Sequence, residues 1–285
     1  MPDVEKIGRR LNAKKVWIHI NLFHPQIFWN NVISDLINPS VNLLNRVGLG
    51  EIFFIHFGQK IEYIKFCVSC PEEKVNFIIN TAERIIDDFL LSQTNESSYN
   101  YSLCDYYIKP YKKLEITTCS YPNADYVDFS NLRGVISKMT IKSTFKFDKE
   151  GILTLYIYSL MAVVRALSSS LLDAKNKVTA LYSFLTENNT GFELLWLNKS
   201  VNKLFSQNGQ DCSAFLNTLF SQTDGSYLEW LEDFIQAVKN EFKNVENFSS
   251  AFILNAIILS SHLGISVSNS IKLTVGLISR AFYLP

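Results

Sequence analysis

The sequence predicts an α+β protein, in which a ferredoxin-like β-α-β-β-α-β part with an antiparallel sheet packs on a large helical part. Two observations lead to this fold class. Residues 16–119 alternate between strand-like and helix-like periodicity, whereas the apolar residues from Glu150 onward recur only at helical spacing. This change of pattern predicts an α+β subdomain at 1–148 and an all-helical subdomain at 149–285, joined in one compact unit.

The α+β part is expected to begin with a strand and a helix. Residues 1–14 are rich in charge and are expected to form a loose arm. The run VWIHINLF at 16–23 alternates apolar and polar side chains, as a half-buried strand does. Residues 26–47 have amphipathic helix spacing, and a kink or break is expected at Asn38-Pro39 because proline lacks a backbone N–H.

A hairpin, a helix and two further strands complete this part. The runs EIFFIHF at 51–57 and EYIKFCV at 62–68 predict two strands joined by a short turn. A helix with acidic residues in its first turn is predicted over 71–91. Strand-like runs follow at 99–108 and 113–119. The resulting order predicts helices on one face of the sheet and leaves the other face for a partner.

The remainder of the chain is expected to be helical after an irregular stretch at 120–148. Asp211 and Asp224 are interpreted as N-terminal caps or first-turn residues of helices, and Gly191 and Gly209 as breaks between helices. The predicted helices span 150–170, 173–187, 190–206, 210–221, 226–243, 248–264 and 269–283.

The composition predicts a well-packed protein with no pronounced charge. Hydrophobic residues make up 47% of the 285 residues and charged residues 19%, which is enough for a sizeable core. Lys+Arg and Asp+Glu number 27 each, so the formal net charge is zero. This balance argues against a nucleic-acid partner and leaves homodimer formation open.

The N-terminal residues, the cysteines and the apolar runs indicate the cellular compartment that we expect. Residues 1–15 lack the apolar core of a signal peptide, and five scattered cysteines fit a reduced, cytoplasmic protein. Cys67 and Cys70 form a C-x-x-C without a second pair, so no metal site is expected. The apolar runs at 152–164 and 251–265 are shorter than the ~20 residues of a membrane span, and we expect no membrane association.

Three polar side chains on the predicted hairpin are candidates for chemistry. His56 lies in the middle of an aromatic strand, either as a half-exposed strand histidine or as a hydrogen-bond donor facing a cleft. Tyr63 and Lys65 share one face of the returning strand. This face is either covered by solvent or a loop, or its hydroxyl and ammonium polarise a substrate carbonyl or bind a carboxylate.

The C-terminal stretch 251–285 predicts two apolar helices separated by a break near Gly264. Ser260, His262 and Ser266 gather polar groups near this break, although a satisfied core histidine is an equally simple interpretation of His262. Arg165 lies in an otherwise apolar helix, where it requires a partner. A structural salt bridge and a substrate contact both remain open for it.

The order of short motifs carries a family resemblance. WIHINLF, FFIHF and YIKF, followed by a helical half with SSHLGIS and ISRAF, resemble the glutamate-elimination domain of class I lanthipeptide dehydratases. Stand-alone relatives of that domain occur in thiopeptide biosynthesis. The family typically has an FFIRY strand, an HLRLRF-like strand and an S-x-x-H-M-x-x-N-R motif. In the eliminating enzymes these arginines and the histidine bind and remove glutamate from glutamylated Ser or Thr.

This chain departs from the family pattern at the arginines. His56 replaces the first strand arginine, and Lys65 and Cys67 stand at the two arginine positions of the next strand. His262 matches the C-terminal histidine, but Ser266-Val267 stands where Asn-Arg is typical. A site that needs guanidinium forks should eliminate glutamate poorly with these replacements.

Thiopeptide pyridine synthases also resemble this domain and lack the arginine set. The resemblance therefore implies a cofactor-independent enzyme that joins two dehydroalanines of a ribosomally made, leader-bearing peptide by a formal aza-Diels–Alder cyclisation. Water and the leader peptide are then lost, which leaves a pyridine-centred macrocycle. The residues expected to be catalytic are His56, Tyr63, Lys65 and His262, and those expected to bind substrate are Arg165, Ser260 and Ser266.

Three other functions remain open. One is glutamate elimination with a partner glutamylation protein, and another is a non-catalytic scaffold that binds the leader peptide. A helical interaction protein without catalytic activity is the third.

Overall fold

The computed structural model describes residues 15–23, 29–46, 53–58, 63–93, 114–119, 129–143, 146–221 and 229–284. The chain divides into two compact units, Met1–Ser130 and Asn131–Pro285. The sequence placed this boundary after residue 148. The difference arises from a helix within the stretch that was expected to be irregular. Each unit is described below by itself.

The first unit contains a four-stranded antiparallel sheet, so the α+β class is confirmed. The strand order is β2-β3-β1-β4, and each neighbouring pair runs antiparallel. The strand predicted at 99–108 lies outside the described residues. The strands are β1 (Lys15–Phe23), β2 (Phe53–Gly58), β3 (Tyr63–Pro71) and β4 (Leu114–Cys119).

Two helical segments connect the strands. The first consists of α2 (Trp29–Asn31), a π-helical segment η2 (Val32–Ile37) and α3 (Asn38–Arg46). The second is a 3₁₀ turn, η3 (Glu72–Lys74), followed by α4 (Val75–Gln93). Among the described residues, the element order around the sheet is thus β-α-β-β-α-β.

The helix continues through Asn38-Pro39 by changing its pitch. The Asn38 N–H bonds to the carbonyl of Ile33, five residues back, which is the widened turn of a π-helix. Pro39 has no N–H and therefore cannot make the bond to the carbonyl four residues before it that an α-helix requires. The sequence predicted a kink or break at this proline, and the structure has a widened turn just before it.

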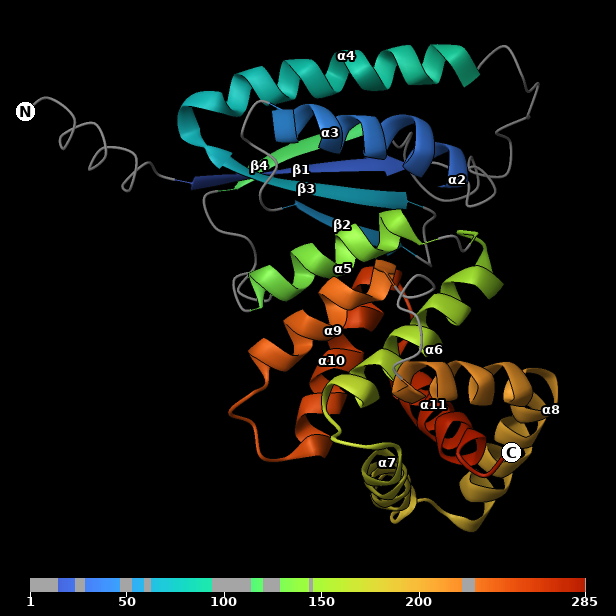
Figure 1. Cartoon of the computed structure of the whole chain (residues 1–285). Coiled ribbons are helices and arrows are strands. Elements are labelled where there is room, and N and C mark those ends of the chain that lie inside the picture. Colours follow the sequence, from blue (N-terminus) through green and yellow to red (C-terminus); the bar gives the residue numbers. More distant parts are fainter. Residues whose placement is uncertain are drawn as a thin grey trace, which may run out of the picture. The chain divides into compact units, whose positions relative to one another are not determined.

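The sheet has one apolar face, which α3 and α4 cover (Figure 1). Successive side chains of a strand point to opposite faces, so the even-numbered residues of β1 and β3 share this side. Those of them that are buried apolar residues are Val16, Ile18, Ile20, Leu22, Ile64, Phe66 and Val68.

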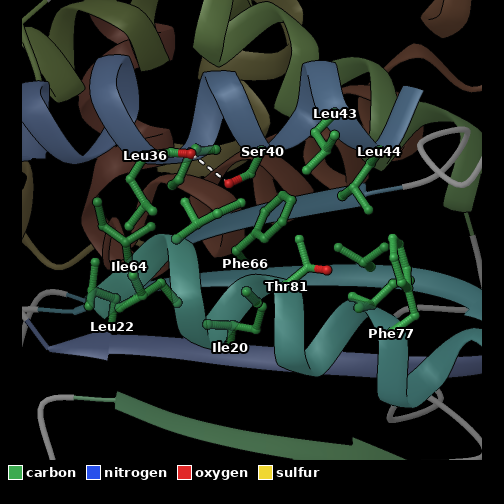
Figure 2. A pocket seen from close by; sticks show the side chains of 16 residues that line it. Ile20, Leu22, Leu36, Ser40, Leu43, Leu44, Ile64, Phe66, Phe77 and Thr81 are labelled. Carbon is green, nitrogen blue, oxygen red and sulfur yellow. Dashed lines mark hydrogen bonds between the residues drawn. The ribbon is translucent and has the colours of Figure 1, made fainter. Parts of the chain in front are cut away.

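A small cavity of about 50 Å³ lies between this face and the two helices (Figure 2). Its lining is apolar except for Ser40 and Thr81. The Ser40 hydroxyl donates to the Leu36 carbonyl at 2.7 Å, so it is satisfied within its own helix. A gap with such a lining suits apolar groups and offers no titratable side chain.

All the regular structure in the described residues of the second unit is helical. Helix α6 is its centre: Leu155, Leu160 and Val163 are fully buried, and its neighbours include α8, α9 and α10. The helices are α5 (Ser130–Lys142), α6 (Lys149–Ala166), α7 (Leu171–Thr186), α8 (Gly191–Ser221), α9 (Glu229–Glu241), α10 (Phe248–Leu263) and α11 (Val267–Ala281). Among the described residues, no single helix is long and apolar enough to cross a membrane; α6 and α7 meet that test only as a pair bent by 117°.

Helix α5 corrects the expectation of an irregular stretch at 120–148. Its apolar residues Leu132, Ile136 and Met139 recur at i, i+4 and i+7 and are buried. Gly134 and the β-branched residues lower the intrinsic helix propensity of the segment, so packing on its neighbours is needed to stabilise it.

Helix α8 corrects the expectation of a break at Gly209. The helix runs unbroken through this glycine, and Asp211 lies inside the helix and does not cap it. A Cβ at Gly209 would come within 2.9 Å of the Phe205 ring, so glycine serves close packing here. Gly191 is the first residue of α8, and Asp224 lies outside the described residues.

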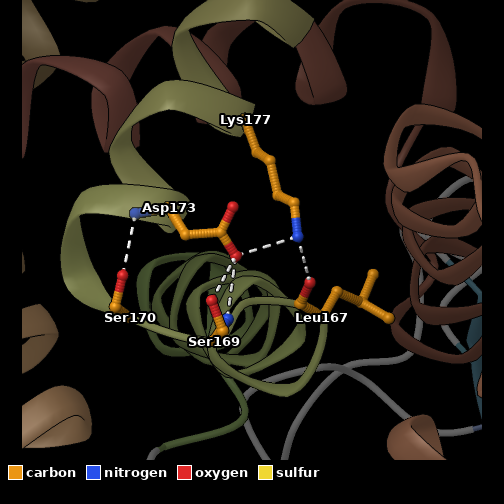
Figure 3. A network of polar contacts seen from close by, with 5 residues as sticks. All are labelled: Leu167, Ser169, Ser170, Asp173 and Lys177. Atoms are coloured by element: carbon orange, nitrogen blue, oxygen red, sulfur yellow. Dashed lines mark hydrogen bonds and ion pairs between the residues drawn. The ribbon is translucent and has the colours of Figure 1, made fainter.

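The turn between α6 and α7 is held by a polar network (Figure 3). The Ser170 hydroxyl accepts from the Asp173 N–H at 3.1 Å, a typical N-cap. The Asp173 carboxylate accepts from the Ser169 N–H at 2.8 Å and from Lys177 at 2.9 Å, and these bonds lower the pKa of Asp173. Lys177 also donates to the Leu167 carbonyl at the end of α6, so the network joins both helix ends.

Candidate functional site

The second face of the sheet gathers the polar side chains of the hairpin. Tyr63, Lys65 and Cys67 are odd-numbered residues of β3 and share this face, opposite the helices. Across the β1–β3 pair, Lys65 stands opposite Asn21, and Cys67 stands opposite His19. The prediction that Tyr63 and Lys65 share a face is therefore confirmed.

Lys65 lies in a row of polar residues that crosses all four strands. It pairs with His56 of β2 on one side and with Asn21 of β1 on the other, and Asn21 pairs with Glu115 of β4. The side chains of His56 and Glu115 lie outside the described part of the structure. The Lys65 and Asn21 side chains are half-buried, which suits groups that meet a ligand.

His19 is the buried titratable group of this face. Its Nδ1 lies 3.6 Å from the Cys67 Sγ, and both side chains are buried. Burial, assisted by the nearby Lys65 ammonium, lowers the pKa of His19 to about 4. His19 is therefore neutral at pH 7, and the positive charge of this cluster rests on Lys65.

Cys67 and Cys70 do not form a joint metal site. The two residues are three apart in a strand, so their side chains point to opposite faces of the sheet. Burial raises the pKa of the Cys70 thiol, which lies on the helix-covered face. Within the described part of the chain, no cluster of three His, Cys, Asp or Glu side chains could hold a metal ion.

A second polar cluster lies in the helical unit, where α10 meets α6. The Ser260 hydroxyl donates to the Tyr156 hydroxyl at 3.1 Å, and both side chains are buried. Burial raises the pKa of Tyr156, and hydrogen bonds with Ser260 and Ser270 partly oppose this shift. His262, two residues on in α10, is also buried. A neutral phenol and a hydroxyl are thus fixed together inside the helical core.

Arg133 of α5 joins the same region of α10. Its guanidinium donates to the Ser261 hydroxyl at 3.3 Å, and Ser261 in turn donates to the Ile258 carbonyl at 2.7 Å. The arginine is 7% exposed. The C-terminal end of α10 thus carries a histidine and two serine hydroxyls within one turn, and the Arg133 cation of α5 bonds to one of these hydroxyls.

Arg165 is engaged at the end of helix α8. Its Nε donates to the Leu219 carbonyl at 2.9 Å, and its guanidinium lies 5.2 Å from the centre of the Phe220 ring. A cation near the last carbonyls of a helix stabilises that end. A structural salt bridge was one of the two possibilities that the sequence left open for Arg165. The observed partners are a carbonyl and an aromatic ring, and the contact likewise stabilises the fold.

Ser266 lies apart from the buried cluster. It is the exposed residue before α11, and its carbonyl accepts from the Ser270 hydroxyl at 2.7 Å. The break that precedes it is confirmed: Gly264 ends α10 with a φ of 66°, in the left-handed region that favours glycine.

The structure thus gathers five of the seven predicted residues in two places, and Arg165 and Ser266 lie apart from both. Tyr63, Lys65 and the backbone position of His56 form adjoining parts of one sheet face, whereas Ser260 and His262 lie in α10. The residues that the sequence did not single out are His19, Tyr156 and Arg133. The alternation of VWIHINLF carried a signal for His19, because a strand paired with β3 places its polar residues on the same face.

Comparisons with known proteins identify the fold. By sequence, the chain matches no protein-family model and no curated protein. By structure, it resembles the pyridine synthase TbtD from thiomuracin biosynthesis, with a TM-score of 0.59 at 12% identity, over 93% of this chain and 97% of that one. It resembles TsrL with a TM-score of 0.56 at 11% identity, over 94% of each chain.

A longer enzyme contains the same fold as a part. The tRNA-dependent lantibiotic dehydratase MibB from Microbispora sp. 107891 aligns with a TM-score of 0.57 at 13% identity, over 93% of this chain but 28% of that one. At these identities the likeness establishes the fold. The chain therefore has the fold shared by a pyridine synthase, TsrL and one part of a lantibiotic dehydratase, as the sequence resemblance implied.

Proposed function

We propose that the protein is a pyridine synthase that acts on a leader-bearing, dehydrated peptide of ribosomal origin. The observation that carries this proposal is the alignment with TbtD over nearly the full length of both chains. It is supported by the polar face of the sheet, where Lys65 and Cys67 occupy the two positions at which the eliminating relatives are expected to carry arginine.

In the proposed reaction, the amide before one dehydroalanine tautomerises to its imidic form and becomes part of a four-atom azadiene. This azadiene adds to the C=C bond of a second dehydroalanine, so that two carbon–carbon bonds form and a six-membered ring closes. The former amide oxygen leaves as water. The nitrogen on the α carbon of the second dehydroalanine leaves with the leader peptide, and these two eliminations make the ring aromatic without an oxidant.

The polar sheet face has groups suited to this chemistry. The Lys65 ammonium and the Tyr63 hydroxyl, both on half-buried side chains, can donate to the amide oxygen as it becomes an imidic hydroxyl. His19 is buried and neutral at pH 7, so it adds no second positive charge beside Lys65. Holding the two reacting arms together lowers the activation barrier by several kcal/mol. This contribution needs no nucleophile.

His56 and His262 remain in the proposed catalytic set. His56 stands opposite Lys65 in the sheet register, and His262 is a buried histidine at the polar end of α10. Ser260 and Ser266 remain as proposed substrate-binding residues. Arg165 is the weakest member of that set, because its guanidinium already bonds to the end of α8.

We also assign the first unit to the ferredoxin-like arrangement. The strand order β2-β3-β1-β4, with antiparallel neighbours, supports this assignment. The second face of such a sheet is a suitable surface for an extended peptide.

The direct test is a synthetic peptide that carries a leader, thiazoles and two dehydroalanines, incubated with the protein and followed by mass spectrometry. The proposal expects a product that has lost water and the leader, and an intact leader amide released in equal amount. Release of neither would contradict it. A Lys65→Met variant and a Lys74→Met variant on the exposed 3₁₀ turn provide a matched pair, of which the first should lose activity.

Glutamate elimination is the second candidate, and the alignment with part of MibB favours it. A peptide with glutamylated serine distinguishes the two reactions. Loss of glutamate with formation of dehydroalanine would support elimination, whereas an unchanged glutamyl peptide together with cyclisation of the first substrate would support the synthase. If neither peptide reacts but the leader binds, the chain is a leader-binding scaffold.

A further inference from the structure

The first two turns of helix α8 expose large apolar side chains that the rest of the helical unit does not cover. Every residue from Gly191 to Trp196 is exposed, although four of the six are large and hydrophobic. Phe192 is 80% exposed, Leu195 70% and Trp196 45%. A monomeric protein rarely leaves such a group of side chains in water, so this surface indicates an interaction site.

The exposed residues are not the packing face of the helix. Leu197 and Val201 are buried one turn apart, and Gly276 of α11 lies so close to Val201 that an added Cβ would come within 2.8 Å of it. Phe192, Leu195 and Trp196 are spaced i, i+3 and i+4 and form a second apolar stripe. Helix α8 thus has one stripe for its own core and another that the unit leaves uncovered.

A hollow beside the stripe carries both signs of charge. It has a volume of about 320 Å³ and is lined by Asn189, Phe192, Glu193, Trp196, Leu197, Asn269 and Lys272. Glu193 exchanges hydrogen bonds with Thr190 at the start of α8, and Lys272 bonds to the Asn189 amide oxygen at 2.7 Å. The apolar stripe is therefore bordered by one carboxylate and one ammonium.

We propose that this surface is the interface of a two-fold symmetric homodimer. In such an interface the same patch meets itself, so a carboxylate of one copy faces the ammonium of the other. A surface with one charge of each sign and an apolar centre suits this arrangement. A strongly charged partner would instead require an excess of one sign. The formal net charge of zero leaves little repulsion between two copies.

The test is sedimentation equilibrium of the full-length protein over a range of concentrations. The unmodified chain should be dimeric, and Leu195→Glu should weaken the dimer by about tenfold or more, because it places a carboxylate in the apolar centre. Leu172→Glu is the matched control, since Leu172 is an equally exposed leucine, 68% exposed, in the first turn of α7. It should leave the dimer intact.

Charge exchange tests the symmetry directly. Lys272→Glu should weaken the dimer, and the double change Glu193→Lys with Lys272→Glu should restore it, because the two opposite charges again face each other. Circular dichroism establishes that each variant is folded. An unmodified chain that stays monomeric at its highest soluble concentration, or a dimer that survives Leu195→Glu, would overturn the proposal. Neither result would affect the cyclisation assay, which depends on the sheet face.

Discussion

The imidazole of His19 and the thiol of Cys67 face each other across the central strand pair, with Nδ1 3.6 Å from Sγ. Both groups are buried, and Lys65 lies one step further along the same face of β3. Burial of the ring and, to a lesser degree, the nearby ammonium disfavour the imidazolium form. We therefore expect protonation of His19 in acid to destabilise the sheet.

Stability should fall when the pH drops from about 6.5 towards 4. The folded pKa of His19, about 4, lies below its ordinary value of 6.5, so the unfolded chain binds the proton first and folding is penalised. The full effect is on the order of 3 kcal/mol. Urea denaturation of the natural chain and of His19→Gln at several pH values measures it. The variant should show a smaller slope in this range, and equal slopes would contradict the prediction.

Replacement of Lys65 should slow the reaction and raise the pKa of the neighbouring His19. If Lys65 polarises the amide oxygen, Lys65→Met should slow cyclisation by about 100-fold, within the usual range for a lost proton donor. The same change should raise the pKa of His19, because one of the two causes of its depression is removed. NMR titration of the imidazole gives this second value. A slower reaction without a change in the His19 pKa would contradict the position of the Lys65 ammonium near His19.

The Tyr156–Ser260 hydrogen bond should contribute to the stability of the helical unit. Removing either hydroxyl, by Tyr156→Phe or Ser260→Ala, leaves a buried partner with fewer bonds and should cost about 1–3 kcal/mol. The double variant should cost less than the sum of the two, by about 1 kcal/mol. Chemical denaturation of the four proteins gives this coupling energy. Strict additivity would show that the two hydroxyls act independently.

Two glycine-to-alanine changes should act in opposite directions. Gly264 ends α10 with a φ of 66°, so Gly264→Ala should destabilise the protein by about 1 kcal/mol. Gly134 lies inside α5, and a Cβ there would meet nothing within 4 Å. Gly134→Ala should therefore stabilise by about 0.5–1 kcal/mol, through helix propensity. Thermal melts of both variants provide the comparison.

The sequence by itself determined the elements whose apolar residues follow one clear period. The alternation in VWIHINLF and YIKFCV predicted the strands β1 and β3, and the break predicted near Gly264 matches the end of α10. It also placed Tyr63 and Lys65 on one face, because neighbouring odd positions of a strand always share a side. These features depend only on local geometry, which a few consecutive residues contain.

Only the tertiary structure decided which distant residues meet. Helix α5 has weak local propensity and is stabilised by packing, and α8 continues through Gly209, where the sequence predicted a break. The pairing of His19 with Cys67 requires the register of two strands about 48 positions apart, and Tyr156 meets Ser260 across 104 positions. Long-range pairing reflects the packing of the whole unit, and no periodicity within one segment encodes it.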